Sequence, residues 1–571
     1  MYREKKRAIL GLTLAVTMAL SPACTQDGGN KQPEASPTET NAQVNADGNY
    51  NILFITADQE HYFDEYPTGA SFEARELLAQ LGTTFEKHYA CSNMSTSSRS
   101  VLYTGTHITD TKMCDNTDYP WQPPISEELS TIGDMMGQAG YYAAYKGKFH
   151  MGSASVLDHS TEPQLQGQND LLGYGFADWN VQGDIVGAAQ EGFYEDMPIA
   201  SETVKWLRST GAQKNTTGQS FFLAVNLVNP HDVMYYDTDD KGEDIQNSGK
   251  TTLGIKGAPD HLLYQTAYPD DLIPPSWNEA INSPGRVAAH GVYLKLWDRR
   301  VGSIPSEEKR WERFRDYYYN CIQDSDNQLM SILKDLVSLD MMDNTIIVFT
   351  SDHGEMQGAH GLRGKGGFMY DNNIHVPLVI VHPEYEGGKR IEAVTCHLDL
   401  APTFVDMTHI SAEKKAAIAS GLAGSSLLKL MDGSASKIRT GALFCFEMLS
   451  MVDDTMTITP DEKGSVTAVY IDFEKRGFVR GITTEGYKFA RYFSPLHFNT
   501  PTTLEELYAN NDVELFDLTK DPGELKNLAA DKEANAELIM ELNTLMNELI
   551  KKEIGTDDGS EVAGIIRNLS Q

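Results

Sequence analysis

The feature that most constrains the fold is an alternation of short apolar runs with longer stretches in which apolar residues recur at helical spacing. Most of the short runs are nearly continuous and rich in β-branched or aromatic residues, as in strands that are covered on both faces. This alternation predicts βαβ units and a parallel sheet. The expected strands are 50–56, 141–145, 221–227, 345–350 and 376–381, and the expected helices include 73–81, 131–139, 202–208 and 313–339.

The pattern changes near residue 434, where shorter strands and then one long amphipathic helix are expected. These strands are 468–473, 477–483 and 487–492, and the helix runs from 531 to about 552. A chain of 571 residues exceeds what one hydrophobic core usually holds. The predicted fold class is therefore α/β, with a large, mostly parallel sheet sandwiched by helices in residues 49–434. A smaller C-terminal α+β domain, with a short antiparallel sheet and a long helix, is expected in residues 435–571.

The first 48 residues are expected to serve export. A basic start precedes the apolar run Ala8–Leu20, which is too short to span a bilayer and is followed by small residues. We therefore expect a signal peptide at 1–23 and a flexible, polar tether at 24–48. Cys24 after Ala23 resembles a bacterial lipoprotein box, which predicts a lipid anchor, and plain cleavage beside an incidental cysteine is the alternative. The expected location is the periplasm or the cell surface.

The net charge of −34, from 81 acidic and 47 basic side chains, argues against nucleic acid as a partner, because phosphate binding rests on basic patches. An anionic substrate would need a local positive site within this acidic chain. The cysteines beyond Cys24 form no disulfide framework and show no zinc spacing. They are Cys91, Cys114, Cys321, Cys396 and Cys445, and Cys91–Cys114 is the first pair to examine for a bridge.

Polar residues follow the ends of four expected strands, although each alone is usually a turn former or a solvated side chain. Asp58 follows the first, Lys148 and His150 the second, His231 the third, and Asp352-His353 the fourth. Ligands of open α/β sheets bind at the carboxyl ends of the strands. The four strand ends therefore predict a single site.

The segment from Ser95 to Gly105 is expected to open a helix, whose N-terminus can face an anion. Taken alone, it reads equally well as an ordinary Ser/Thr-rich helix cap. It also resembles the sulfatase signature, in which Cys or Ser, any residue, Pro or Ala, Ser and Arg precede a Thr-Gly pair. Ser95 occupies the nucleophile position, and Ser98-Arg99 and Thr104-Gly105 match, whereas Ser97 replaces the usual Pro or Ala.

This resemblance to the sulfatase family, within the alkaline-phosphatase-like superfamily, implies that a maturation enzyme oxidises Ser95 to formylglycine (3-oxoalanine). The aldehyde would hydrate to a diol, and one hydroxyl would attack sulfur as the ester oxygen leaves. The second hydroxyl would then lose its proton and expel sulfate. Starting from serine resembles the anaerobic bacterial route. An unmodified serine would be a weak nucleophile without a base or a metal.

The resemblance also implies one divalent metal, held by Asp58, Gln59, Ser95, Asp352 and His353. Carboxylates, a carboxamide oxygen and one imidazole suit a hard cation, with Ca²⁺ expected first and Mg²⁺ or Mn²⁺ as alternatives. Gln59 departs from the usual second aspartate and resembles the choline-sulfatase and phosphonate monoester hydrolase branch.

Further matches to the family imply catalytic residues in addition to Ser95 and Arg99. Residues 147–150 resemble a Gly-Lys-Trp-His segment, whose Lys148 and His150 would contact the diol and the sulfate. His231 would bind sulfate and protonate the leaving oxygen, a task that a histidine with an ordinary pKa suits. Lys365 would grip sulfate.

The sequence therefore predicts a sulfuric ester hydrolase that acts on a sulfated carbohydrate or a small organic sulfate. One alternative is a phosphonate or phosphate ester hydrolase of the same superfamily, because both anions are tetrahedral. Another is a non-catalytic protein that binds sulfated glycans, if Ser95 stays unmodified. Specificity is expected from the loops 164–193 and 236–303.

Overall fold

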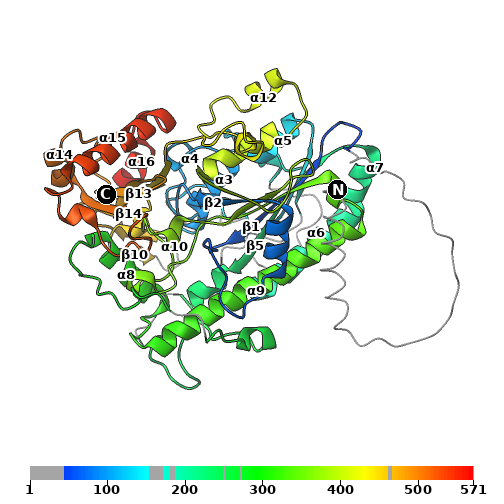
Figure 1. Ribbon diagram of the computed structural model, residues 1–571. Helices are drawn as coiled ribbons and strands as arrows, with labels where there is room; N and C mark the ends of the chain where they lie inside the picture. The colour runs from blue at the N-terminus through cyan, green and yellow to red at the C-terminus, as the bar shows by residue number, and fades with distance from the viewer. Residues whose placement is uncertain are drawn as a thin grey trace, which may run out of the picture.

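The computed structural model describes residues 44–152, 171–179, 187–248, 251, 253–269, 273–460 and 466–569. Its centre is an eight-stranded sheet in the order β4-β3-β5-β1-β6-β7-β2-β8 (Figure 1). The strands are β1 (Asn51–Asp58), β2 (Thr83–Tyr89), β3 (Tyr142–Gly147), β4 (Asp178–Trp179), β5 (Phe221–Pro230), β6 (Thr345–Ser351), β7 (Leu378–Val381) and β8 (Lys389–Cys396). The predicted mostly parallel sheet is confirmed; the exception is β7, which runs antiparallel to β6 and β2.

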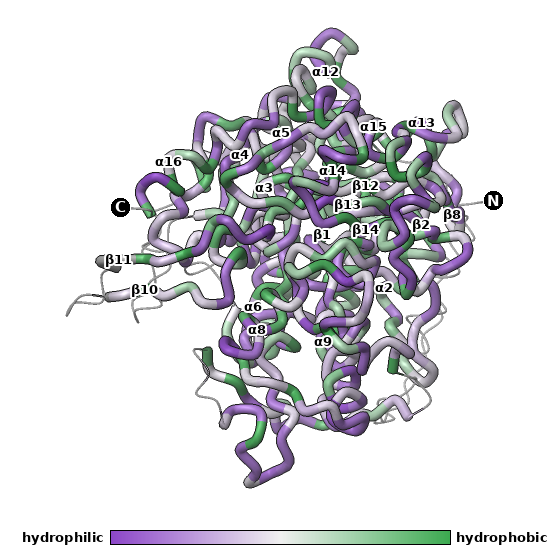
Figure 2. The backbone as a smooth tube through the Cα atoms, turned by 90° about the vertical axis from the view of Figure 1, so that its left-hand side faces the viewer, coloured by the Kyte–Doolittle hydropathy of each residue, from purple (hydrophilic) through white to green (hydrophobic). Residues whose placement is uncertain are grey.

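Strand β1 shows why the central strands read as continuous apolar runs. All eight of its residues are buried, between β5 on one side and β6 on the other. Because side chains alternate across a strand, Ile52 and Phe54 enter one core while Leu53 and Ile55 enter the other. Figure 2 shows hydrophobic stretches along the central elements and hydrophilic ones in peripheral loops.

Helices cover both faces of this sheet. One face packs against α2 (Glu73–Leu81), α6 (Glu191–Trp206) and α9 (Glu308–Ser338), and the other against α3 (Ser95–Thr104), α5 (Ile132–Gln138) and α11 (Leu400–Asp406). The 31 residues of α9 extend for about 46 Å. The Asp326 carboxylate of α9 accepts hydrogen bonds from the backbone N–H groups of Ala74 and Arg75, so a side chain of α9 caps the start of α2.

A second, antiparallel sheet has the order β14-β13-β12-β9 and confirms the small C-terminal sheet and long helix. Its strands are β9 (Ala442–Phe446), β12 (Phe478–Thr483), β13 (Tyr487–Phe493) and β14 (Asp512–Asp517), beside α14 (Leu504–Asn510), α15 (Ala536–Glu553) and α16 (Ser560–Leu569). The expected strand 468–473 is instead β11 (Val466–Tyr470), which pairs with β10 (Thr457–Pro460) in a separate ribbon. One core joins Phe446 and Phe489 of this region to Val101 of α3, while the boundary at 434/435 stays a prediction.

The remaining helices are short connectors, apart from α8. They are α4 (Ile108–Thr111), α7 (Ala212–Thr217), α8 (Ala288–Val301), α10 (Asp371–Ile374), α12 (Ala412–Ile418) and α13 (Leu428–Met431). None of the helices in the described ranges is both long and apolar enough to cross a bilayer.

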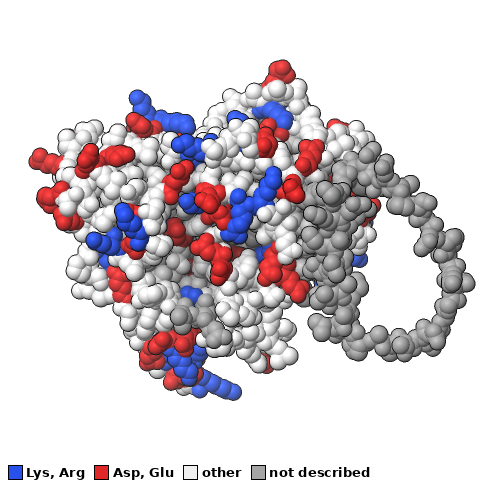
Figure 3. Space-filling model, viewed as in Figure 1, with Lys and Arg blue, Asp and Glu red and all other residues white. Residues whose placement is uncertain are grey.

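Cys91 and Cys114, the first pair to examine for a bridge, form none: both are free and buried, as are the other three described cysteines. Cys114 Sγ instead donates to Glu447 Oε2 over 3.4 Å. The expected signal peptide, Cys24 and most of the expected tether lie outside the described residues. On the face drawn in Figure 3, acidic and basic side chains are interspersed and no broad basic field is visible.

Candidate active site

The four strands that end in polar residues are neighbours in the sheet. The order β3-β5-β1-β6 is parallel throughout, so their carboxyl ends lie side by side at one edge. Asp58 ends β1, Lys148 follows β3, His231 follows β5, and Asp352-His353 follows β6. The structure therefore brings together the residues that the sequence placed at separate strand ends.

Helix α3 delivers Ser95 to this edge. All ten of its residues are buried, and most of its hydroxyls donate to backbone carbonyls: Ser100 to Ser97 and Thr104 to Ser100, each over 2.7 Å. Met94, with φ of +69°, occupies the cap position, and no side chain caps the helix. Ser95 is therefore the first helical residue and not an ordinary cap.

The Ser95 hydroxyl meets two residues of the strand ends, Asp58 and His353, and also Lys365. Lys365 Nζ donates to Ser95 Oγ over 3.0 Å, His353 Nε2 lies 3.1 Å from it, and both carboxylate oxygens of Asp58 lie at 3.5 Å. All of these side chains are buried. Lys365 arrives from the segment between β6 and β7.

Cations surround the Asp58 carboxylate. Lys148 Nζ lies 2.8 Å and Arg99 Nη2 3.1 Å from its Oδ2, and Lys365 Nζ lies 3.8 Å from Oδ1. Burial by itself raises the pKa of Asp58, but these cations and His231 hold that pKa well below its usual range. Burial also lowers the pKa of Lys365 to about 8. The site thus concentrates positive charge within an acidic chain.

Arg99 ties the two carboxylates of the cluster together. Its Nη2 pairs with Asp58, and its Nε lies 3.0 Å from Asp352 Oδ2. The Nη1 atom donates to the carbonyl of Lys148 and to Asn226 Oδ1, at 2.8 and 3.2 Å. A fully buried guanidinium with these partners fixes the relative positions of β1, β3, β5 and β6.

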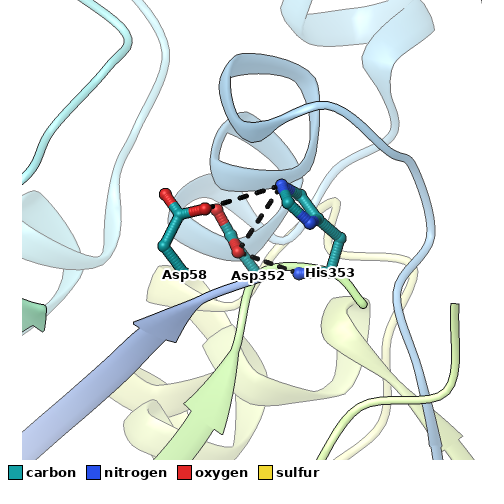
Figure 4. Close-up of side chains that lie close together, drawn as sticks. All are labelled: Asp58, Asp352 and His353. Atoms are coloured by element: carbon teal, nitrogen blue, oxygen red, sulfur yellow. Dashed lines mark hydrogen bonds and ion pairs between the residues drawn. The ribbon is translucent and has the colours of Figure 1, made fainter. Parts of the chain in front are cut away.

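Asp58, Asp352 and His353 could hold a metal ion, because one ligand atom from each lies within 4.8 Å of the others (Figure 4). His353 Nδ1 lies 3.2 Å from the carbonyl oxygen of Gly354, which directs the Nε2 lone pair toward both carboxylates. Burial lowers the pKa of His353 to about 4, so the ring is neutral near pH 7. A neutral imidazole with two carboxylates is a suitable ligand set.

Gln59 directly follows Asp58 and is a further candidate ligand. Its φ is +76°, and three neighbours hold it: Asp352 Oδ1 accepts its N–H at 3.1 Å, Tyr318 donates to its carbonyl at 2.9 Å, and Glu355 accepts from its amide nitrogen. Its buried Oε1 has no hydrogen-bond partner among the described residues. An oriented oxygen with an unused lone pair fits a hard cation.

The two candidate sulfate-binding histidines have different surroundings. His150 Nε2 lies 3.2 Å from Asp118 Oδ1. His231 is buried, and its Nδ1 has no hydrogen-bond partner in the described part of the chain. Burial, followed by the charges of Lys148 and Lys365, holds the pKa of His231 well below its usual range. The expectation of an ordinary pKa for His231 is therefore not met.

Four supporting residues were not predicted from the sequence. Asn226 and Glu355 carry signals that could have identified them, because Asn226 interrupts an apolar strand and Glu355 directly follows Asp352-His353-Gly354. Tyr318 and Asp118 carry no such signal, since only the fold brings them to Gln59 and His150. The expected specificity loops 164–193 and 236–303 lie partly outside the described residues.

Comparison with known proteins finds similarity to sulfatases over most of the chain. The sulfatase family model matches residues 50–410. A delta 4,5-hexuronate-2-O-sulfatase of Bacteroides thetaiotaomicron is 24% identical over 83% of this chain and 82% of its own length. Arylsulfatase K of Gallus gallus is 26% identical over 67% of this chain, and the match spans 66% of that relative.

Among solved structures, one in complex with its substrate D-glucosamine-2-N,6-O-disulfate superposes with a TM-score of 0.62. It is 19% identical and covers 90% of this chain and 99% of its own. The sheet, its flanking helices and the smaller antiparallel sheet define an alkaline-phosphatase-like fold. The chain belongs to the sulfatase family.

Proposed function

We propose that the protein is a sulfuric ester hydrolase that removes sulfate from a sulfated carbohydrate, with a formylglycine made from Ser95 and one divalent metal. The observation that carries this proposal is the setting of Ser95 Oγ, 3.0 Å from Lys365 Nζ and 3.1 Å from His353 Nε2. A buried hydroxyl beside a metal-ligand set and a lysine suits attack on a tetrahedral anion.

Asp58, Gln59, Asp352 and His353 would hold the metal, with the modified Ser95 beside them. Ca²⁺ is the first candidate, because three of these side chains offer oxygen, and Mg²⁺ or Mn²⁺ are the alternatives. When bound, the metal supplies Lewis-acid polarisation of a sulfate oxygen. Formylglycine supplies, in its hydrated form, a nucleophilic hydroxyl and a second hydroxyl whose deprotonation releases sulfate.

The cationic side chains bind and orient the ester. Lys148 and Lys365 flank Asp58 and would contact sulfate oxygens, while Arg99 keeps Asp58 and Asp352 in place. His150, whose Nε2 lies 3.2 Å from Asp118 Oδ1, would be a further contact to the sulfate. The positive charges of Lys148, Lys365 and Arg99 would stabilise the negative charge that develops on the sulfuryl group.

His231 would hold the proton for the leaving oxygen. Without substrate its ring is neutral, because burial and two lysines lower its pKa. The negative charge of an arriving sulfate ester opposes both lysines and raises that pKa. Substrate binding therefore favours protonation of His231 in the complex that reacts.

A sulfated glycan is the proposed substrate class, because the named relatives include a hexuronate sulfatase and a structure bound to a disulfated glucosamine. The partners in this proposal are the sulfated substrate and the enzyme that oxidises Ser95. The basic and apolar start of the chain supports export to the periplasm or cell surface, with a lipid on Cys24 as the anchor. Replacing Cys24 by Ala would then release the protein from membranes.

Mass spectrometry of the peptide that contains Ser95 tests the modification, because conversion to formylglycine removes two hydrogens. The protein must come from a host that has the maturation enzyme. Intact serine in such a host would overturn the catalytic proposal and favour a sulfated-glycan-binding protein.

Paired sulfate and phosphonate esters of one alcohol test the reaction. Because the proposed ligands include Gln59 and His353, hydrolysis of a phosphonate or phosphate ester is the alternative that this comparison tests. Faster turnover of the sulfate ester is expected, and faster turnover of the phosphonate would favour the alternative.

A further inference from the structure

A cavity of about 160 Å³ lies beside the loop that carries Lys365, and none of its walls belongs to the site around Ser95. Its walls come from the segment 277–279, from α8 and the residues after it, from the start of α9, and from Gly361 with Arg363. The side chains that bear on its chemistry are Trp277, Glu279, Asp298, Ser303, Trp311 and Arg363.

Arg363 lines this cavity, and one nitrogen of its guanidinium has no partner within the described residues. Its side chain is 3% exposed, and its Nη2 donates to the carbonyl of Gly302 and lies 3.3 Å from Asp298 Oδ1. Its Nη1 has no hydrogen-bond partner within the part of the chain that the structure describes. Because a buried donor without an acceptor is unfavourable, a ligand oxygen here would be stabilised.

Two indole rings give the cavity apolar walls. Trp311 of α9 is buried, and Trp277 is half-buried. Flat aromatic surfaces of this kind pack against the less polar face of a sugar ring while its hydroxyls reach the polar groups around it. At about 160 Å³ the cavity is smaller than the roughly 300–1,000 Å³ of pockets for drug-sized ligands, so it suits no more than a single small ring.

The charges at the cavity favour an uncharged ring over an acidic one. Glu279 pairs with His360 Nδ1 at 3.0 Å and lies 3.9 Å from Arg286 Nη1, and Asp298 pairs with Arg363, so each carboxylate of the lining already has a basic partner. The charges of the lining are therefore matched among themselves, and no surplus positive charge favours a carboxylate or a sulfate of the ligand. Sugar hydroxyls can accept from Arg363 and also donate to the carboxylates.

We propose that this cavity is a subsite for an uncharged sugar residue of a longer substrate; the assignment rests on the proposed function. Arg363 and Lys365 are two residues apart, so their Cα atoms are within about 7 Å of each other. Lys365 reaches Ser95 while Arg363 lines the cavity. One loop thus carries a contact to the sulfated residue and a contact to a neutral residue of the same glycan.

Tryptophan fluorescence tests the subsite directly, because two of the six tryptophans line the cavity. The full chain is titrated with methyl β-D-glucopyranoside, methyl β-D-galactopyranoside and N-acetylglucosamine, and with glucuronic acid as the charged counterpart. At least one neutral sugar should give a saturable change in the millimolar range, and glucuronic acid should bind more weakly.

Variants assign the binding to this cavity. Trp277→Leu and Arg363→Gln should each raise the dissociation constant by about tenfold or more, because each removes a direct contact. Lys309→Gln, an exposed change on α9, should bind as the wild type does. Thermal unfolding checks that each variant is folded, and Trp277→Leu decides the question if Arg363→Gln does not fold.

The two proposals fail in different ways. Absence of saturable binding by any neutral sugar, tighter binding of glucuronic acid, or wild-type affinity in Trp277→Leu would overturn the subsite, whatever the protein hydrolyses. Loss of sulfatase activity in every assay, together with neutral sugar binding that depends on Trp277, would overturn the proposed function and leave a neutral-sugar site.

Discussion

Ser95 differs from the other hydroxyl residues of α3 in the partners of its side chain. Ser100 and Thr104 donate to backbone carbonyls of their own helix, and the cap position belongs to Met94. The Ser95 hydroxyl instead meets Lys365, His353 and Asp58. Since it supports no part of the helix, this hydroxyl can be converted or removed with little effect on the fold.

Ser95→Ala is therefore expected to abolish sulfate ester turnover and to change the free energy of unfolding by no more than about 1 kcal/mol. Turnover of 4-nitrophenyl sulfate and urea unfolding measure the two effects. Ser97→Ala is the matched control, because it restores the alanine of the signature and removes only a 3.5 Å contact to the Cys114 carbonyl. Wild-type turnover in Ser95→Ala would contradict the mechanism.

Glu355 holds the amide of Gln59 and also accepts the backbone N–H groups of Gln357 and Gly364. Glu355→Gln should weaken metal binding by about 10- to 100-fold, because the Gln59 oxygen loses its fixed orientation. Calorimetric titration of the metal-free protein with Ca²⁺ measures this. Glu413→Gln, at an exposed position, is the control, and equal affinity in Glu355→Gln would count against the ligand role of Gln59.

Single residues were predictable where a strand end fixes their position, and unpredictable where only packing does. Asp58, Lys148 and Asp352 follow apolar runs that are visible in the sequence. Tyr318 lies on α9, 259 residues after Gln59 in the chain, and no local pattern predicts the contact between them. His231 was placed at the correct strand end, but its lowered pKa depends on burial and on Lys148 and Lys365.

At the scale of elements, the sequence predicted the strands whose apolar residues form a continuous run and the helices whose apolar residues recur at helical spacing. Strands β1, β5 and β6 and helices α2 and α9 lie where these patterns placed them. Strands β2 and β8 were missed because charged residues interrupt them; the first two residues of β8 are exposed. The expected strand 376–381 is real only over Leu378–Val381, and its antiparallel direction carries no signal in composition.

The contact between α8 and the C-terminal sheet contains a buried carboxyl that should make stability depend on pH. Glu514 of β14 accepts from Tyr492 over 2.7 Å and lies 3.7 Å from His290 of α8. Burial raises the pKa of Glu514 to about 7. The folded state then binds a proton more tightly than the unfolded state, so stability falls as the pH rises from about 4.5 to about 7.

Glu514→Gln should remove this contribution, which is on the order of 3 kcal/mol. Urea unfolding at pH 5 and pH 8 measures it in the wild type and the variant. The wild type should lose more stability than the variant between these two pH values. An equal loss in both proteins would show that Glu514 does not titrate in this range.

At the scale of the whole molecule, a net charge of −34 opposes the approach of an anionic substrate to a site that is locally positive. The lysines and Arg99 act over a few ångströms, whereas the surplus of acidic side chains acts over the surface. Salt screens the long-range field more effectively than the contacts within the buried site.

The kcat/KM for a sulfated oligosaccharide should therefore rise, by about twofold or more, between 0.01 M and 0.15 M ionic strength. The kcat at saturating substrate serves as the internal control and should change little, because encounter no longer limits it. A fall in kcat/KM with added salt would mean that local attraction dominates encounter.

The reversed direction of β7 has a consequence for how this architecture can diversify. Because β7 runs antiparallel to β6, it begins at the edge where β6 ends, and the chain between Ser351 and Leu378 never crosses the sheet. This connection carries His353, Lys365 and Arg363. A change in the length of this connection would therefore leave the strand order untouched, provided that His353 and Lys365 keep their contacts with Ser95.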